Sequence, residues 1–350
     1  MEEAGGLVVI DGEQLRIITT DPNFSPFSEE ADLITGDRIL KIVESSVKLP
    51  LYGLSFSSLP RSFLSAAIDR IGRGLETESF SSKEFSKEEG LKIVREYISA
   101  LADQFRDEPI VVSVLDGSAL KLFLDDEDDF AMLAENLFTD LDTKDTGKLS
   151  RSQIKNALAH MGADMGVPPF SESNDLLTDI LKKHGAEGGE LLGQAQFAQL
   201  LQPVLQDLAD SLAETHITVI QNIKIINGSR LRKVLDDTES FNVVIGKMYT
   251  EWEAYDVTGK DRMEKLCNFL KVKGQLLGLP PPDSNEAIPF LYDQIFLGIV
   301  NEKLAGDSGG GHDNDKFNKE TFEEIVRFAI EKFAEQLEAT PVLLGQGSGE

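Results

Sequence analysis

Apolar residues recur every three or four positions along most of the chain, which is the spacing that places them on one face of a helix. One such stripe near the middle of the chain consists of Phe130, Leu133, Leu137, Phe138 and Leu141. After a polar gap, the same spacing continues in Ile154, Ala157 and Leu158. A comparable stripe in the last third consists of Phe241, Val244, Ile245, Met248, Tyr249 and Trp252. The pattern therefore predicts pairs of amphipathic helices separated by short polar loops.

Runs of β-branched residues precede the helical segments. Ile110–Leu115 and Ile217–Ile226 are the clearest of these runs, and Val9-Ile10 is a fainter copy. Each is followed at once by Asp-Gly or Asn-Gly, a dipeptide that favours a turn. The sequence thus predicts a short strand before each helical unit.

The chain repeats itself with a period near 110 residues. Val114-Leu115-Asp116-Gly117-Ser118 recurs as Ile225-Ile226-Asn227-Gly228-Ser229. Gly162, Gly166 and Pro168 recur at a nearly constant offset as Gly274, Gly278 and Pro280. Glycines and prolines at matching distances place turns at matching positions, so the repeat has structural meaning. We expect a mainly α fold of three tandem helix–loop–helix pairs, at 7–108, 110–215 and 217–338, with 339–350 as a disordered tail.

One polar gap has a particular frame. Asp142 opens a segment of twelve residues in which Gly147 is sixth and Leu149 is eighth. Oxygen atoms are available at odd-numbered positions of this segment. They are on the side chains of Asp142, Thr146 and Ser150, at the first, fifth and ninth positions, and on the main chain of Lys148 at the seventh. Gln153 supplies a further oxygen at the twelfth place.

This frame resembles the calcium loop of EF-hand proteins in the calmodulin superfamily. Three pairs of such hands resemble the six-EF-hand proteins calbindin and secretagogin, as does the string Trp252, Tyr255, Asp256 and Asn268-Phe269-Leu270. Over its whole length the chain is also similar to plant calcium sensors that bind and inhibit sucrose-non-fermenting-related protein kinases. The resemblance implies a calcium-sensor-like regulator that acts by protein–protein interaction. It also implies Ca²⁺ as the cofactor and a stress-related plant protein kinase as the partner.

The candidate metal ligands are Asp142, Thr146, Lys148, Ser150 and Gln153. They depart from the family pattern at two places, because Lys144 stands third where an acid or amide is expected and Gln153 stands twelfth where Glu is expected. Only one formal negative charge would face the ion. Two hypotheses stay open: a weak calcium sensor, and a calcium-independent scaffold in which every hand is structural.

The other expected loops have lost more of the pattern. Residues 78–89 retain Glu89 at the end, 185–196 retain Gln196, and 254–265 end in Lys265. Leu54-Ser55-Phe56-Ser57-Ser58-Leu59 resembles 149–154 and predicts the first loop of the first unit. In this family the eighth residues of two neighbouring loops pair through backbone hydrogen bonds. The resemblance therefore implies that Leu149 pairs with Leu192.

Charge and composition limit the possible partners. The formal net charge of −27 disfavours nucleic acid and anionic membranes, because neutralising phosphates requires a basic surface. It favours a basic segment of a protein, held in an apolar groove between helices. A single cysteine and an acidic, non-signal N-terminus predict a cytoplasmic protein, with the nucleus as an alternative.

Catalytic chemistry is not predicted. The four histidines, His160, His184, His216 and His312, lie at no metal-ligand spacing. Cys267 falls on an apolar helical stripe, where a packing role is expected. Neither paired catalytic carboxylates nor a Ser-His-Asp arrangement is discernible, so we expect no enzyme.

Overall fold

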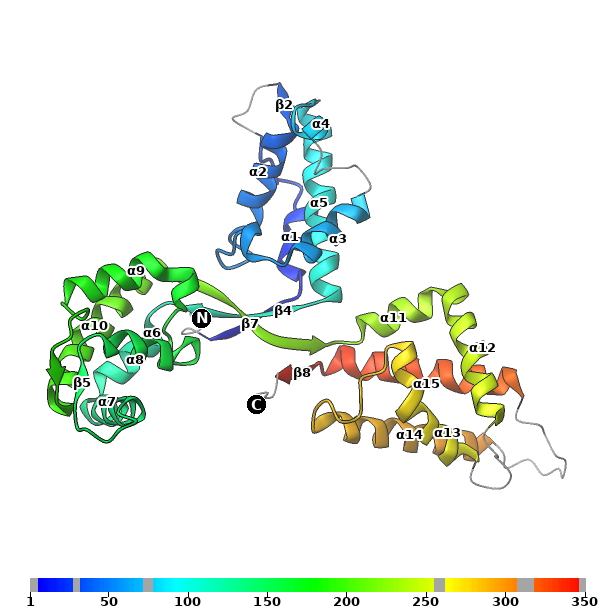
Figure 1. Ribbon diagram of the computed structural model, residues 1–350. Coiled ribbons are helices and arrows are strands. Elements are labelled where there is room, and N and C mark those ends of the chain that lie inside the picture. The colour runs from blue at the N-terminus through cyan, green and yellow to red at the C-terminus, as the bar shows by residue number, and fades with distance from the viewer. Residues whose placement is uncertain (1–5, 28–31, 72–77, 255–261, 307–317, 346–350) are drawn as a thin grey trace. The chain divides into compact units, whose positions relative to one another are not determined.

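The computed structural model describes residues 6–27, 32–71, 78–254, 262–306 and 318–345 (Figure 1). The chain divides into two compact units, of which unit 1 contains residues 1–105 and 110–221, and unit 2 contains residues 106–109 and 222–350. Most described residues are helical, and the strands are few and short, which confirms the predicted fold class in its general form. No helix in the described part of the chain combines the length and apolar character that crossing a lipid bilayer requires.

The first half of unit 1 surrounds a core that is built from Ile39, Val43, Ile93, Ile98 and Phe105 among others. Its elements are β1 (Leu7–Ile10), α1 (Glu13–Thr20), β2 (Leu33–Thr35), α2 (Gly36–Val47), the 3₁₀ turn η1 (Phe56–Ser58), α3 (Arg61–Ile71), α4 (Glu78–Ser81), β3 (Glu84–Ser86) and α5 (Lys87–Asp107). The long α5 supplies the largest share of buried residues, because one of its faces is apolar over most of its length.

The second half of unit 1 has a core of its own, in which the expected stripe on residues 130–138 is buried. Its elements are β4 (Ile110–Leu115), α6 (Ser118–Asp125), α7 (Glu127–Leu141), β5 (Leu149–Ser150), α8 (Gln153–Met161), the 3₁₀ turn η2 (Ala163–Met165), α9 (Phe170–Lys183), β6 (Leu191–Leu192) and α10 (Gln194–Glu214). β7 (Ile217–Ile226) follows and contributes residues to both units.

The described helices of unit 2 follow the same order as those of the second half of unit 1, around a third core rich in aromatic rings. After β7 come α11 (Ser229–Asp236), α12 (Thr238–Ala254), α13 (Arg262–Lys273), the 3₁₀ turn η3 (Gly274–Leu277), α14 (Ala287–Gly306), α15 (Lys319–Ala339) and β8 (Val342–Gly345). Phe322 on α15 lies within ring-contact distance of Tyr249, Trp252 and Phe269.

The predicted strands Ile110–Leu115 and Ile217–Ile226 are confirmed, and both belong to antiparallel sheet. β1 pairs with β4, with Leu7 opposite Ser113 and Ile10 opposite Ile110. β8 pairs with the second half of β7, with Val342 opposite Ile226. The expectation of a disordered tail over 339–350 is therefore wrong at 342–345, because these apolar residues complete the ladder of a strand that would otherwise leave polar groups unpaired. Residues 346–350 lie outside the described part.

The repeated Asp-Gly or Asn-Gly turn has a steric origin that is the same in each copy. Gly117 has φ +82°, and a Cβ there would stand 2.2 Å from the carbonyl oxygen of Ala209 on α10. Asp116 accepts a hydrogen bond from the Ser118 N–H at 2.9 Å, which fixes the turn into α6. Gly12 against Ala102 and Gly228 against Ala334 repeat the close approach, with 2.3 and 2.6 Å. Glycine is required because any side chain would collide with the long final helix of each copy.

The candidate metal loop and its partner loops

Asp142 organises the loop between α7 and α8 through its carboxylate. The N–H groups of Thr146 and Gly147 donate to it at 3.0 and 2.6 Å, and the Thr146 hydroxyl lies 2.9 Å away. Gly147 has φ +67°, which lets the chain turn back toward Asp142. The hydrogen bonds, led by the one from the Thr146 backbone, hold the pKa of Asp142 below its usual value. The loop therefore keeps its shape through its own donors.

Three of the five predicted ligands meet in this loop. Thr146 Oγ1 lies 2.9 Å from a carboxylate oxygen of Asp142 and 3.0 Å from the carbonyl oxygen of Lys148. These oxygens form a compact cluster at the first, fifth and seventh positions of the loop. Hard oxygen atoms of this kind are what Ca²⁺ prefers.

The other two predicted ligands lie elsewhere. Ser150 Oγ is 2.8 Å from Ser152 Oγ, and Gln153 Oε1 accepts a hydrogen bond from Asn156 Nδ2 at 2.6 Å. The Gln153 side-chain oxygen is thereby engaged by a residue of α8. Within the described residues, no three His, Cys, Asp or Glu side chains are grouped closely enough to hold a metal ion. The cluster at Asp142 thus offers one carboxylate, one hydroxyl and one carbonyl.

The loop at Asp142 pairs with the loop before α10, as predicted. Leu149 stands opposite Leu192 and Ser150 opposite Leu191 in an antiparallel ladder. The ladder continues in hydrogen bonds from the N–H of Arg151 to the carbonyl of Glu190 and from the N–H of Ser152 to that of Gly188. Leu149 and Leu192 are both buried in the core of this half of unit 1. Two helix–loop–helix segments are therefore joined back to back through their loops.

An equivalent ladder exists in the first half of unit 1, but one of its strands is not where the sequence predicted. Ile34 pairs with Phe85, so β2 and β3 join the loops. The expected loop at 54–59 is wrong, because Phe56–Ser58 form the 3₁₀ turn η1 after α2 has ended. Leu33-Ile34-Thr35 forms the strand of this loop instead. Its middle residue, Ile34, is buried, and the Thr35 side chain caps α2 by accepting a hydrogen bond from the Arg38 N–H.

In the other described loops, the residue at the twelfth position caps the helix that follows. Glu89 accepts hydrogen bonds from the N–H and hydroxyl of Ser86, both at 3.1 Å. Gln196 accepts one from the Gly193 N–H at 3.1 Å. The Glu89 N–H also donates to Ser86 Oγ at 3.3 Å, which completes a capping box, whereas Gly193 has no side chain and Gln196 caps alone. Both contacts occupy side chains that would otherwise be available to an ion. For the loop at 254–265, Asp256 lies outside the described residues.

Cys267 and His184, for which the sequence predicts no metal-binding or catalytic role, both have structural surroundings that explain them. Cys267 is buried, and burial raises the pKa of its thiol to about 11, which fits the predicted packing role. His184 Nε2 lies 2.7 Å from a carboxylate oxygen of Asp207, and Lys183 Nζ lies 2.5 Å from the same oxygen. This cluster ties the end of α9 to α10. The sequence did not predict it, because His184 and Asp207 are 23 residues apart and no motif joins them.

No protein-family model matches the chain, and neither a curated protein nor a solved structure matches it.

Proposed function

We propose that the chain is an EF-hand-type regulator, with six hands in three pairs, that acts by binding another protein. The observation that carries the proposal is the ladder between Leu149 and Leu192, which joins two helix–loop–helix segments around a loop closed by Asp142. The similar ladder between Ile34 and Phe85 supports a second pair. The glycine contacts of Gly12, Gly117 and Gly228 support a threefold arrangement.

The loop at 142–153 is the candidate calcium sensor. Asp142, Thr146 and the Lys148 carbonyl already converge, so an ion would need little rearrangement of the first half of the loop. Completing the shell requires Gln153 to leave Asn156 and turn inward. With a single carboxylate to offset the loss of hydration, affinity would be low compared with loops that offer three or four acids.

The partner is proposed to be a protein held in an apolar groove between helices, and by resemblance a stress-related plant protein kinase that the chain would inhibit. The net charge of −27 supports a partner with basic segments. By the same resemblance and by composition, the site of action would be the cytoplasm, with the nucleus as an alternative.

Calcium is expected to raise the melting temperature of the wild-type protein relative to chelator, because a ligand that binds the native state adds RT ln(1 + [L]/Kd) to its stability. The Asp142→Ala variant should lose this increase, since the one ligating carboxylate is gone. Asp145→Asn is the matched control: it removes a neighbouring negative charge but keeps the hydrogen bond from the backbone N–H of residue 145 to the Asp142 carbonyl. It should keep the calcium response. Differential scanning calorimetry at saturating calcium measures all three.

An equal rise for wild type and Asp142→Ala would contradict calcium binding at this loop. No rise in any variant would favour the second candidate, a calcium-independent scaffold. One observation already favours that candidate: both carboxylate oxygens of Asp142 are satisfied by donors of the loop itself. Affinity capture of the partner from cell extract with and without chelator separates the two, because a scaffold would capture it equally in both conditions.

A further inference from the structure

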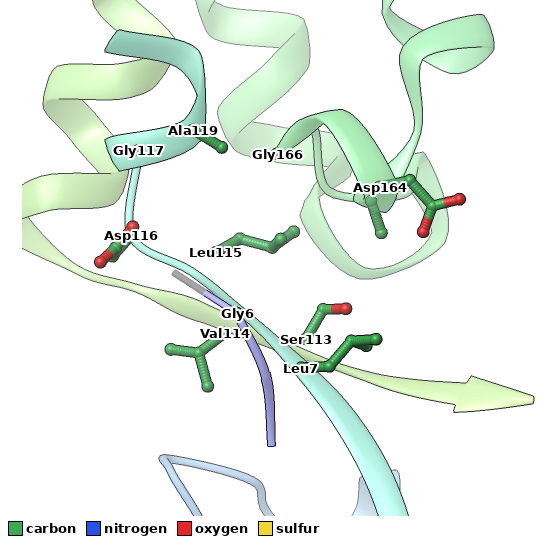
Figure 2. A pocket seen from close by; sticks show the side chains of 11 residues that line it. Gly6, Leu7, Ser113, Val114, Leu115, Asp116, Gly117, Ala119, Asp164 and Gly166 are labelled. Atoms are coloured by element: carbon green, nitrogen blue, oxygen red, sulfur yellow. The ribbon is translucent and has the colours of Figure 1, made fainter. Parts of the chain in front are cut away.

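A pocket of about 170 Å³ lies in unit 1 where β1 and the end of β4 meet the turn into α6 and the 3₁₀ turn η2 (Figure 2). Its lining is formed by Gly6, Leu7, Ser113, Val114, Leu115, Asp116, Gly117, Ala119, Ala163, Asp164 and Gly166. Figure 2 shows the Leu115 side chain extending into the space between the strands and η2. Most of the lining residues are aliphatic or glycine, and the two acids, Asp116 and Asp164, stand on opposite sides (Figure 2).

The volume of the pocket limits the size of the group that it can hold. Sites for drug-sized ligands and cofactors usually occupy about 300–1,000 Å³, which is larger than this space. An apolar cavity of about 150 Å³ accommodates one benzene ring. The pocket is therefore suited to a single aliphatic or aromatic side chain, rather than to a whole cofactor.

The strand beside the pocket has an unused edge. Among the described residues β1 pairs only with β4, and it stands at one end of the strand order. Leu7 and Val9, which point to the same face, are 62% and 47% exposed. Exposed apolar side chains next to unpaired main-chain groups invite the addition of another strand.

Ser113 adds a polar anchor. It is buried and stands opposite Leu7 in the ladder, and its oxygen accepts a hydrogen bond from Gln221 Nε2 at 2.8 Å. Its hydroxyl proton has no acceptor among the described residues, so it is available to a carbonyl group that enters the pocket. A buried hydroxyl with an unused donor gains more from such a contact than an exposed one would.

The charge around the pocket is negative. Asp164 is exposed and forms no ion pair or hydrogen bond with any other described residue, while Asp116 lies on the opposite side. Together with the net charge of −27, these acids favour a basic ligand. We propose that an extended, basic segment of a partner protein adds to the free edge of β1 and inserts one apolar side chain into this pocket. The proposal rests on the protein-binding role proposed above, but needs neither calcium nor a helical ligand.

A synthetic peptide of alternating lysine and aliphatic residues, capped at both ends, is a suitable probe. It would be titrated in chelator into the full-length protein with labelled methyl groups, and binding followed by NMR. We expect saturable shifts of the methyl signals of Leu7, Val114 and Leu115, and no change at the loop around Leu149. A peptide with glutamate in place of lysine should bind much more weakly.

Two variants test the site. Ala163→Phe fills the pocket from η2 and should weaken binding by about tenfold or more, because burying one apolar side chain contributes at least that much. Asp164→Lys should weaken binding without altering the fold, since the residue is exposed and forms no ion pair with another described residue. Unchanged methyl signals in the cores of unit 1 away from the pocket and an unchanged melting temperature establish that each variant is folded. If Ala163→Phe does not fold, Leu7→Lys replaces it.

Equal binding by wild type and a folded pocket-filled variant would overturn the proposal, as would equal binding of the glutamate peptide. The last experiment repeats the peptide titration with a chain that lacks residues 1–5. If this deletion strengthens peptide binding at least tenfold, the protein's own N-terminus is the occupant and the proposal is wrong. Because every titration is done in chelator, failure of the calcium response leaves these results unaffected, and failure here leaves the calcium test unaffected.

Discussion

Replacing Gly117 with alanine is expected to lower the free energy of unfolding of the second half of unit 1 by about 2–5 kcal/mol. The new Cβ would stand 2.2 Å from the carbonyl oxygen of Ala209, so α6 and α10 would have to move apart, a kind of overpacking that usually costs about 1–3 kcal/mol. The φ of +82° adds about 1–2 kcal/mol for a residue with a side chain. Hydrogen exchange of the α10 amides around Ala209 measures the loss.

Gly147→Ala is the matched control for that experiment. Gly147 also has a positive φ, +67°, but apart from its two chain neighbours no described residue has an atom within 4 Å of the position a Cβ would take. It should cost only about 1 kcal/mol for the backbone conformation. If both variants lost the same protection, the close approach of Gly117 to α10 would not be a determinant of the fold.

Phe322→Ala is expected to destabilise unit 2 by about 3–5 kcal/mol, the usual range for deleting a fully buried phenylalanine. Its ring is fully buried, with centroids 5.5 Å from Tyr249, 6.1 Å from Trp252 and 6.3 Å from Phe269. The substitution leaves a cavity at the centre of this cluster and removes three ring contacts at once. Urea unfolding followed by the fluorescence of Trp252, the single tryptophan of the chain, measures the effect.

Phe290→Ala provides the comparison within the same unit. Phe290 lies on α14 and is 76% exposed, so its removal should change stability by less than about 0.5 kcal/mol. Comparable losses in the two variants would show that the aromatic cluster around Phe322 is not the core of unit 2.

Regular patterns in the sequence predicted several of the helices and the first strands of the repeats. The stripe on residues 130–138 is buried on α7, and Ile110–Leu115 and Ile217–Ile226 are strands over the predicted residues. The Leu149–Leu192 pairing was also predictable, because both leucines hold the same place in their loops. Local periodicity and turn residues carry this information directly.

Other features depended on contacts that no local pattern reveals. Leu54–Leu59 resembled a loop end in its residues, yet the chain pairs Ile34 with Phe85 instead. Residues 342–345 have no helical period, and their strand exists because β7 offers an edge about 120 residues earlier in the chain. Gln153 was predicted as a ligand by its place, whereas the nearby Asn156 amide determines where its oxygen lies. Long-range pairing and side-chain competition decided each of these cases.

Nuclear Overhauser contacts between Leu149 and Leu192, recorded in chelator, test the central claim that metal-free loops join the helix–loop–helix segments in pairs. Their backbone protons should show the strong cross-strand contacts of a residue pair in an antiparallel ladder, accompanied by a contact between Ser150 and Leu191. The absence of both contacts in a protein whose helices are fully formed would contradict the paired-loop architecture, and with it the proposed regulator.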